Sequence, residues 1–122
     1  MRNIEKEMIQ AVKNKKSWCK SNTNTVYMKE ADRVEVYLHG NHIVNVWFDK
    51  EEATIVFLRD AGWMTNTTKS RLNAICNEFL PYGIGIYQKD WRWFVATDKG
   101  DVNWEGTLTF QKWKGEFIRR VA

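Results

Sequence analysis

Cysteines and sulfur-based motifs are scarce in this sequence, and that scarcity excludes two classes of small protein. The chain of 122 residues has two cysteines, Cys19 and Cys76, which lie far apart. They form neither the dense disulfide framework of a small secreted domain nor a Cys-x-x-Cys metal motif. We therefore expect two free thiols in a reducing compartment.

Long apolar runs are absent as well. The N-terminal stretch MRNIEKEMIQAVKNKK is charged throughout, so it has no continuous apolar segment of the kind found in a signal peptide or a membrane anchor. No other segment is long and apolar enough to span a bilayer. The sequence therefore predicts a cytoplasmic protein without a membrane partner, in a bacterium or in a cell infected by a virus.

Motifs for catalysis and metal binding are also missing. Ser17 and the two cysteines have no evident base with an orienting third group, which nucleophilic catalysis requires. His39 and His42 flank a tight turn, but a zinc site needs more ligands than this neighbourhood offers. The carboxylates show no spacing that indicates a catalytic pair. We predict a protein that is not an enzyme and has no metal site and no cofactor.

Aromatic side chains are abundant, in contrast. The seven tryptophans exceed what packing alone usually demands in so short a chain, so we expect some rings to be exposed for stacking or for a partner surface. The net charge of +4 creates a mild positive field that attracts anions without identifying nucleic acid. The aromatic excess, together with exposed strand edges, predicts a homo-oligomer.

Two amphipathic helices are predicted from the spacing of apolar residues. The first spans residues 3–16, with Asn3 as its N-cap. The second begins near Asn66 or Thr67 and ends at residues 80–83, because proline cannot continue the hydrogen-bond ladder. Each helix is expected to lie on a sheet.

The sheet is predicted from alternating apolar and polar residues. Residues 23–58 alternate in this way, with a hairpin turn at Gly40-Asn41 and a further turn at residues 49–52. This pattern is typical of an antiparallel meander. Later runs at residues 84–97 and 101–113 extend it.

The whole chain, residues 1–122, is predicted to form a single α+β domain. A chain of this length supports one core and leaves no room for a second domain. We expect an antiparallel meander of about five to seven strands, with an N-terminal helix and a mid-chain helix packed on it. The C-terminal tail, residues 117–122, is either an edge strand or frayed.

The segment from Gly62 to Arg71 is the most informative about function. At a helix start the first backbone N–H groups have no intrahelical partner, and the helix dipole favours negative charge, so such an end accepts phosphate. Lys69 and Arg71 place cations where an acid is normally favoured, which predicts an anion site. The alternative is an ordinary N-cap with solvated or ion-paired cations. The spacing differs from that of a nucleotide-hydrolysing phosphate loop.

Aromatic residues near this segment would add a stacking surface. Trp63 precedes the helix, and Trp91 and Trp93 share one face of a later strand, which is either core or a platform for a base. Near the C terminus, Arg119 either contacts phosphate or is solvated. The predicted ligand-binding residues are Trp63, Asn66, Thr67, Thr68, Lys69, Arg71, Tyr87, Arg92, Trp93 and Arg119.

The chain resembles a family of small bacteriophage proteins of largely unassigned role in the segments IEKEM, VYLHGNHI and GWMTNTTKSRLNAI. The resemblance covers residues 1–110. It implies a phage origin, and such proteins often block a host defence. In that setting the chain is similar to the anti-Thoeris proteins, oligomers that sequester cyclic ADP-ribose signals with aromatic and basic residues at subunit boundaries. Their binding residues do not align with this sequence one by one.

The resulting prediction is a phage counter-defence protein that sequesters a small phosphate-bearing nucleotide signal of the cyclic ADP-ribose type without hydrolysing it. One alternative is a single-stranded nucleic-acid-binding protein whose tryptophans stack on bases. Another is an inhibitor that docks its aromatic surface on a host defence enzyme. The dispersed positive residues favour the small ligand over nucleic acid as the partner.

Overall fold

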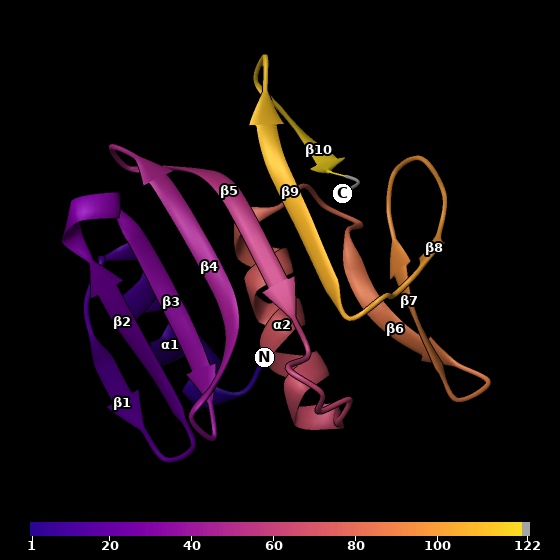
Figure 1. The fold of residues 1–122 in the computed structure, drawn as a ribbon, viewed down its shortest axis with the longest axis horizontal. Helices are drawn as coiled ribbons and strands as arrows, with labels where there is room; N and C mark the ends of the chain where they lie inside the picture. The colour runs from indigo at the N-terminus through magenta and orange to yellow at the C-terminus, as the bar shows by residue number, and fades with distance from the viewer. Residues whose placement is uncertain (121–122) are drawn as a thin grey trace.

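The computed structural model describes residues 1–120 of the chain (Figure 1). Its elements are α1 (Asn3–Lys13), β1 (Trp18–Lys20), β2 (Thr23–Met28), the short 3-10 helix η1 (Lys29–Ala31), β3 (Arg33–Leu38), β4 (Asn41–Asp49), β5 (Glu52–Arg59), α2 (Asn66–Phe79), β6 (Gly85–Lys89), β7 (Arg92–Ala96), β8 (Val102–Asn103), β9 (Thr107–Trp113) and β10 (Glu116–Arg120). Within the described range, seven strands form a large sheet and three form a small one. The predicted α+β fold class is confirmed.

The large sheet is a meander that is completed from the end of the chain. Its strand order is β1-β2-β3-β4-β5-β9-β10, with antiparallel pairing throughout. Strand β9 pairs with β5 so that Ile55 lies opposite Gln111 and Leu58 lies opposite Leu108. Helix α2 and the small sheet, in the order β6-β7-β8, are therefore inserted between two neighbouring strands of the large sheet.

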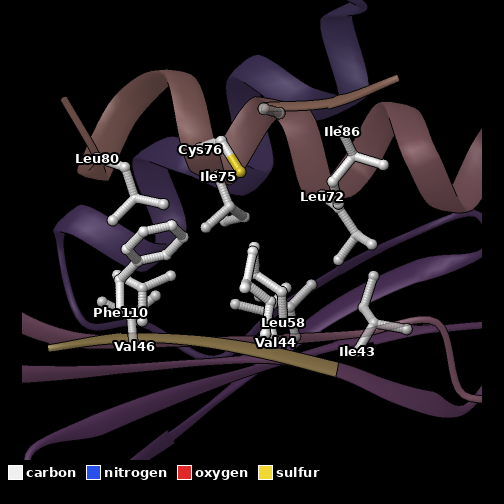
Figure 2. Close-up of a cluster of buried hydrophobic side chains, with 14 of the residues drawn as sticks. Ile43, Val44, Val46, Leu58, Leu72, Ile75, Cys76, Leu80, Ile86 and Phe110 are labelled. Carbon is white, nitrogen blue, oxygen red and sulfur yellow. The ribbon is translucent and has the colours of Figure 1, made fainter. Parts of the chain in front are cut away.

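The core lies between the helices and one face of the large sheet. Figure 1 shows both helices on the same side of that sheet. Figure 2 shows the side chains of α2 directed toward the strands, and both sides of this contact are buried because the helix has an apolar stripe and the strands alternate. The facing residues are Leu72, Ile75, Cys76 and Leu80 from the helix and Ile43, Val44, Val46, Leu58 and Phe110 from the sheet. Neither helix of the described range is long and apolar enough to cross a bilayer.

The helix boundaries differ slightly from the prediction. Helix α1 is shorter than residues 3–16, and its N-cap position is Arg2 rather than Asn3. The backbone N–H of Arg2 donates to the Glu5 carboxylate over 3.3 Å, which ties the two together at the helix start. Helix α2 begins at Asn66 as predicted, and its cap is the preceding residue, Thr65, whose hydroxyl accepts from the Thr68 N–H over 3.1 Å.

The predicted later strands are divided differently in the structure. The run over residues 84–97 is a hairpin of β6 and β7, with its turn at Asp90 and Trp91. The run over residues 101–113 contributes β8 to the small sheet and β9 to the large one. The tail forms edge strand β10 up to Arg120, and its last two residues lie outside the described range.

The first hairpin is also displaced from its predicted position by one residue. Its turn consists of His39 and Gly40, both with positive φ, and Leu38 pairs with Asn41 across it. Positive φ at both central residues is the backbone pattern of a tight hairpin turn. This shift places the His39 side chain at the turn, where it becomes part of the site described below.

The two thiols differ sharply in exposure, which gives a direct test of the core. Cys19 is exposed, whereas Cys76 is fully buried in α2, and this burial raises the pKa of its thiol to about 12. Because the thiolate is the reactive form, we expect a maleimide to modify Cys19 alone in the native protein and both cysteines in denaturant, as counted by mass spectrometry. Rapid double modification without denaturant would show that α2 does not pack as described.

Candidate functional site at the start of the second helix

A cavity of about 440 Å³ lies at the start of α2. Its walls come from the β3–β4 hairpin, the segment that follows β5, and the first turn of α2. The volume falls within the range of about 300–1,000 Å³ that is usual for small-molecule sites. Segments distant in the sequence therefore meet around one hollow of suitable size.

The first turn of α2 provides a wall of hydrogen-bond donors. Thr65, Thr67 and Thr68 line the cavity, and the hydroxyls of Thr65 and Thr68 lie 3.0 Å apart. Thr68 is buried, and its N–H donates to the Thr65 hydroxyl. These contacts fix its position. The first backbone N–H groups of a helix have no partner inside it and carry partial positive charge, so this wall suits an anion.

The β3–β4 hairpin forms another wall and the floor. Leu38 and Ile43 are buried and supply an apolar floor, while His39 and Asn41 place polar side chains around it. The backbone N–H of His39 donates to the Asn22 carbonyl over 2.7 Å and thereby anchors the turn. An apolar surface with a few polar groups is the usual composition of a small-molecule site.

Trp63 stands beside the cavity on a loop that is held by Asp60. The tryptophan side chain is 59% exposed, and its backbone N–H donates to the Asp60 carbonyl over 2.9 Å. The buried Asp60 carboxylate accepts from the Gly62 N–H and from the Trp104 indole N–H, each over 2.8 Å. Asp60 is therefore a positioning residue, which fixes the loop that presents the Trp63 ring.

Some predicted site residues are brought together here. Trp63, Thr67 and Thr68 line the cavity, and Asn66 is exposed in the same first helical turn. Sequence reasoning missed His39 and Asn41, which reach the cavity only through the tertiary packing of the β3–β4 hairpin against this helix start. His42 does not line the cavity, and its Nε2 lies 2.7 Å from the Asn45 side-chain oxygen.

Arg71 corrects the predicted anion site, because its guanidinium is buried elsewhere. It forms an ion pair with Glu5 of α1, with 2.8 Å between Nη1 and Oε2, and it donates to Thr23 over 3.0 Å and to Asn22 over 3.2 Å. Its side chain is 3% exposed. Arg71 therefore joins the two helices to β2 and does not line the cavity.

The environment of the Glu5 carboxylate favours its ionised form, which the ion pair with Arg71 requires. Burial acts to raise the pKa of Glu5, but hydrogen bonds from Ser70 and Arg71 outweigh it and hold the pKa below its usual range. The Ser70 hydroxyl donates to Oε2 over 2.6 Å. The buried charge is thus compensated by donors from the first turns of α2, which stabilises the contact between the helices.

Trp93 is a second correction, since the structure places it in the core. It is 5% exposed and packs near Trp104, with ring centroids 6.1 Å apart, so its faces are not open to a base. The Nζ of Lys69 lies 5.9 Å from the Trp93 centroid, and Lys69 is therefore directed along the small sheet. Trp91 lies in the hairpin turn and does not share a strand face with Trp93.

Of the remaining predicted residues, Tyr87 and Arg92 lie on the small sheet and Arg119 lies on β10 of the large sheet. Tyr87 and Arg119 line a separate hollow of about 640 Å³, and Arg92 is exposed opposite Lys89. None of these residues lines the cavity at the start of α2. The predicted set is thus divided between the cavity, the interior of the protein and the surface around the small sheet.

A comparison with protein families finds a match over nearly the whole chain. The model of a family described as Kyanoviridae Gp96 protein matches residues 1–116. Comparisons with curated proteins and with solved structures find no match. The extent of the family match confirms the resemblance to small phage proteins. The chain therefore belongs to the Kyanoviridae Gp96 family of phage proteins.

Proposed function

We propose that this phage protein sequesters a small phosphate-bearing nucleotide signal of the cyclic ADP-ribose type, without hydrolysing it, in the cavity at the start of α2. The observation that carries the proposal is the meeting of a helix N-terminus and an open tryptophan ring at one hollow of about 440 Å³. A phosphate and a base are the chemical groups that these two features bind. In a phage protein, such binding would lower the concentration of the free host signal.

The phosphate would be held mainly by neutral donors. Among the described residues, no lysine or arginine lines the cavity. The donors at the helix start are the backbone N–H groups of Asn66 and Thr67 and the Thr67 hydroxyl, and the helix dipole adds its positive end. The Thr68 N–H already donates to the cap residue Thr65. Binding would therefore depend less on salt than binding through several cationic side chains.

The base would stack on Trp63. More than half of this side chain is exposed, so a ring face is open, and the loop beneath it is fixed by the hydrogen bonds of Asp60. Leu38 and Ile43 offer apolar contact at the floor of the same cavity. A large aromatic surface with a rigid support suits reversible stacking, because little side-chain freedom is lost on binding.

We propose that the ligand is not hydrolysed, because the carboxylate at the cavity is already engaged in hydrogen bonds. Asp60, the carboxylate at the cavity, already accepts hydrogen bonds on both of its oxygens, from Gly62 and from Trp104. A general base must be free to reach the proton that it abstracts. The arrangement supports holding a ligand over activating water.

Replacing Trp63 by alanine is expected to weaken ligand binding by about 5- to 150-fold, because stacking on an aromatic side chain contributes on that scale. Calorimetry with cyclic ADP-ribose isomers and cyclic oligonucleotides measures the change. Trp113→Ala is the matched control, since this tryptophan is 62% exposed and lies on β9, outside the cavity.

The outcome of that experiment also tests the chemistry. The ligand should be recovered intact after the protein is denatured, and recovery of a cleaved product would overturn the proposal of sequestration. Absence of heat with every one of these nucleotides would overturn the proposed ligand class. Equal binding by Trp63→Ala and the unmodified chain would show that the ligand lies elsewhere.

The proposal includes a homo-oligomer, with its contact on the outer face of the large sheet. No helix of the described range covers that face (Figure 1). It carries the partly exposed apolar side chains of Trp47, Ile55 and Phe57, which lie on neighbouring strands. Light scattering would measure the mass in solution, and a monomer at high concentration would contradict this part of the proposal.

A further inference from the structure

The hairpin of β6 and β7 ends in a turn that is costly to form. It projects away from the large sheet (Figure 1), and its turn residues Asp90 and Trp91 have φ values of 52° and 65°. Positive φ at these positions favours glycine or asparagine, and a bulky residue there is strained. Trp91 is 92% exposed, so burial of its indole in the core does not offset this strain.

Next to this turn, cations and further rings share one face of the hairpin. Lys89 pairs directly with Arg92, both exposed, and like charges directly opposite each other destabilise a sheet. Two residues further along the strands, Tyr87 and Phe94 form the next rung on the same face. Their rings are stacked, with centroids 5.5 Å apart and an interplanar angle of 24°.

A hydrogen bond fixes the second ring pair. The Tyr87 hydroxyl donates to the Asp101 carboxylate over 2.6 Å. The hairpin face, defined as Tyr87, Lys89, Arg92 and Phe94 together with Trp91 in the turn beside them, therefore has a ring at the turn, then a cationic rung and then a stacked ring pair along the strands. Exposed indole, backbone strain and like-charge pairing all lower stability here, and such local conflicts with folding are expected at functional sites.

We propose that the hairpin face binds single-stranded nucleic acid. Bases would stack on Trp91 and on the Tyr87–Phe94 pair, and two phosphates between them would contact the cations, one at Lys89 and one at Arg92. The order of rings and cations complements the order of bases and phosphates in a single strand. Unpaired bases are required, because a duplex buries the base faces that these rings would contact.

The hollow that Tyr87, Lys89 and Phe94 line limits the length of the bound strand. Arg119 lies at its edge, but Asp101 and Glu105 line it as well and oppose a polyanion. The contact is therefore confined to the hairpin end and covers a few nucleotides. Its location on the small sheet separates this inference from the ligand proposed for the cavity at the start of α2.

Fluorescence anisotropy with a labelled oligothymidylate tests the inference on the full chain. Trp91→Ala is expected to weaken binding by about 5- to 150-fold, the range for one stacked base. A plot of log affinity against log salt should have a slope of about −1.4, as expected for two phosphate contacts on a single strand. The double variant Lys89→Gln/Arg92→Gln should bring this slope close to zero.

Matched variants separate binding from folding. Tyr82→Ala removes another fully exposed ring outside the hairpin face and should bind like the unmodified chain. Trp91→Gly places glycine at a φ that it readily adopts, so it should melt no lower than the unmodified chain and still lose binding. Trp63→Ala, which alters the cavity, should leave oligonucleotide binding unchanged.

Defined results would overturn the inference. These are no binding of the oligothymidylate at low salt, unchanged affinity in Trp91→Ala, or equal affinity for a duplex of the same length. Equal loss of binding in Tyr82→Ala and Trp91→Ala would also overturn it, because the effect would then not depend on the hairpin face.

Discussion

Replacing Arg71 by alanine is expected to lower the free energy of unfolding by about 3–5 kcal/mol, because it leaves a buried charge without its partner. The Glu5 and Arg71 side chains are each 3% exposed, and their contact joins α1 to α2. Arg71 also donates to Thr23 and Asn22, so the substitution removes further hydrogen bonds at β2 and the loop before it. Urea unfolding followed by tryptophan fluorescence measures the loss.

Two further variants show whether the buried charge is the cause. Lys13→Ala breaks an ion pair with Glu78 whose side chains are 48% and 33% exposed, and it should change stability by less than about 1 kcal/mol. The double variant Glu5→Gln/Arg71→Met removes both charges and should recover much of the loss, because no unpaired ion is left in the core. A small loss in Arg71→Ala alone would contradict the argument.

The same ion pair predicts how stability changes with pH. The folded-state pKa of Glu5 lies below its ordinary value of 4.5, so the folded state favours the ionised carboxylate. The stabilisation is fully present above the ordinary pKa and is lost as the pH falls through the lowered folded-state pKa. Unfolding in urea at several pH values should show this decline in the unmodified chain and a smaller decline in Glu5→Gln.

Replacing Asp60 by alanine is expected to lower the free energy of unfolding by about 2–4 kcal/mol, because it leaves two N–H donors without an acceptor. The Trp104 indole N–H is buried, and the Gly62 N–H holds the turn that leads to Trp63. The same change should weaken ligand binding at the cavity, since the loop would no longer be fixed. Thermal unfolding and calorimetry on one preparation measure both effects.

Asp98→Ala serves as the control for that substitution. Asp98 is exposed in the turn between β7 and β8, so its removal should change stability by about 0.5 kcal/mol or less. Equal stability of Asp60→Ala and Asp98→Ala would contradict the role given to Asp60. If Asp60→Ala loses stability but binds the ligand as before, Asp60 anchors Trp104 and does not position Trp63 for binding.

Local patterns made much of the fold predictable. The meander from β2 to β5 follows from alternation along the chain, and the start of α2 follows from an apolar stripe with a threonine cap before it. The pairing of β9 with β5 was not predictable, because its partners lie far apart and alternation says nothing about which strand is the neighbour. The division of the later strands between two sheets could not be predicted for the same reason.

The residues of the candidate site also differ in whether local sequence could predict them. Trp63, Thr67 and Thr68 could be predicted, because the donors at a helix start and the ring before it are near one another in sequence. The burial of Arg71 could not, since Glu5 lies 66 residues away and the charge of a first-turn residue does not reveal its partner. Asp60 did carry a signal in the sequence, because an aspartate two residues before a glycine is typical of a turn.

The insertion of α2 and the small sheet between β5 and β9 has a consequence for how the protein is made. Strands β1 to β5 leave the ribosome first, and β5 remains an open edge until Thr107–Trp113 have been translated. During that interval the backbone donors and acceptors along the β5 edge lack β9, their partner in the folded protein. A ribosome that stops before residue 107 would therefore release a polypeptide whose β5 edge is free to pair with a neighbouring molecule.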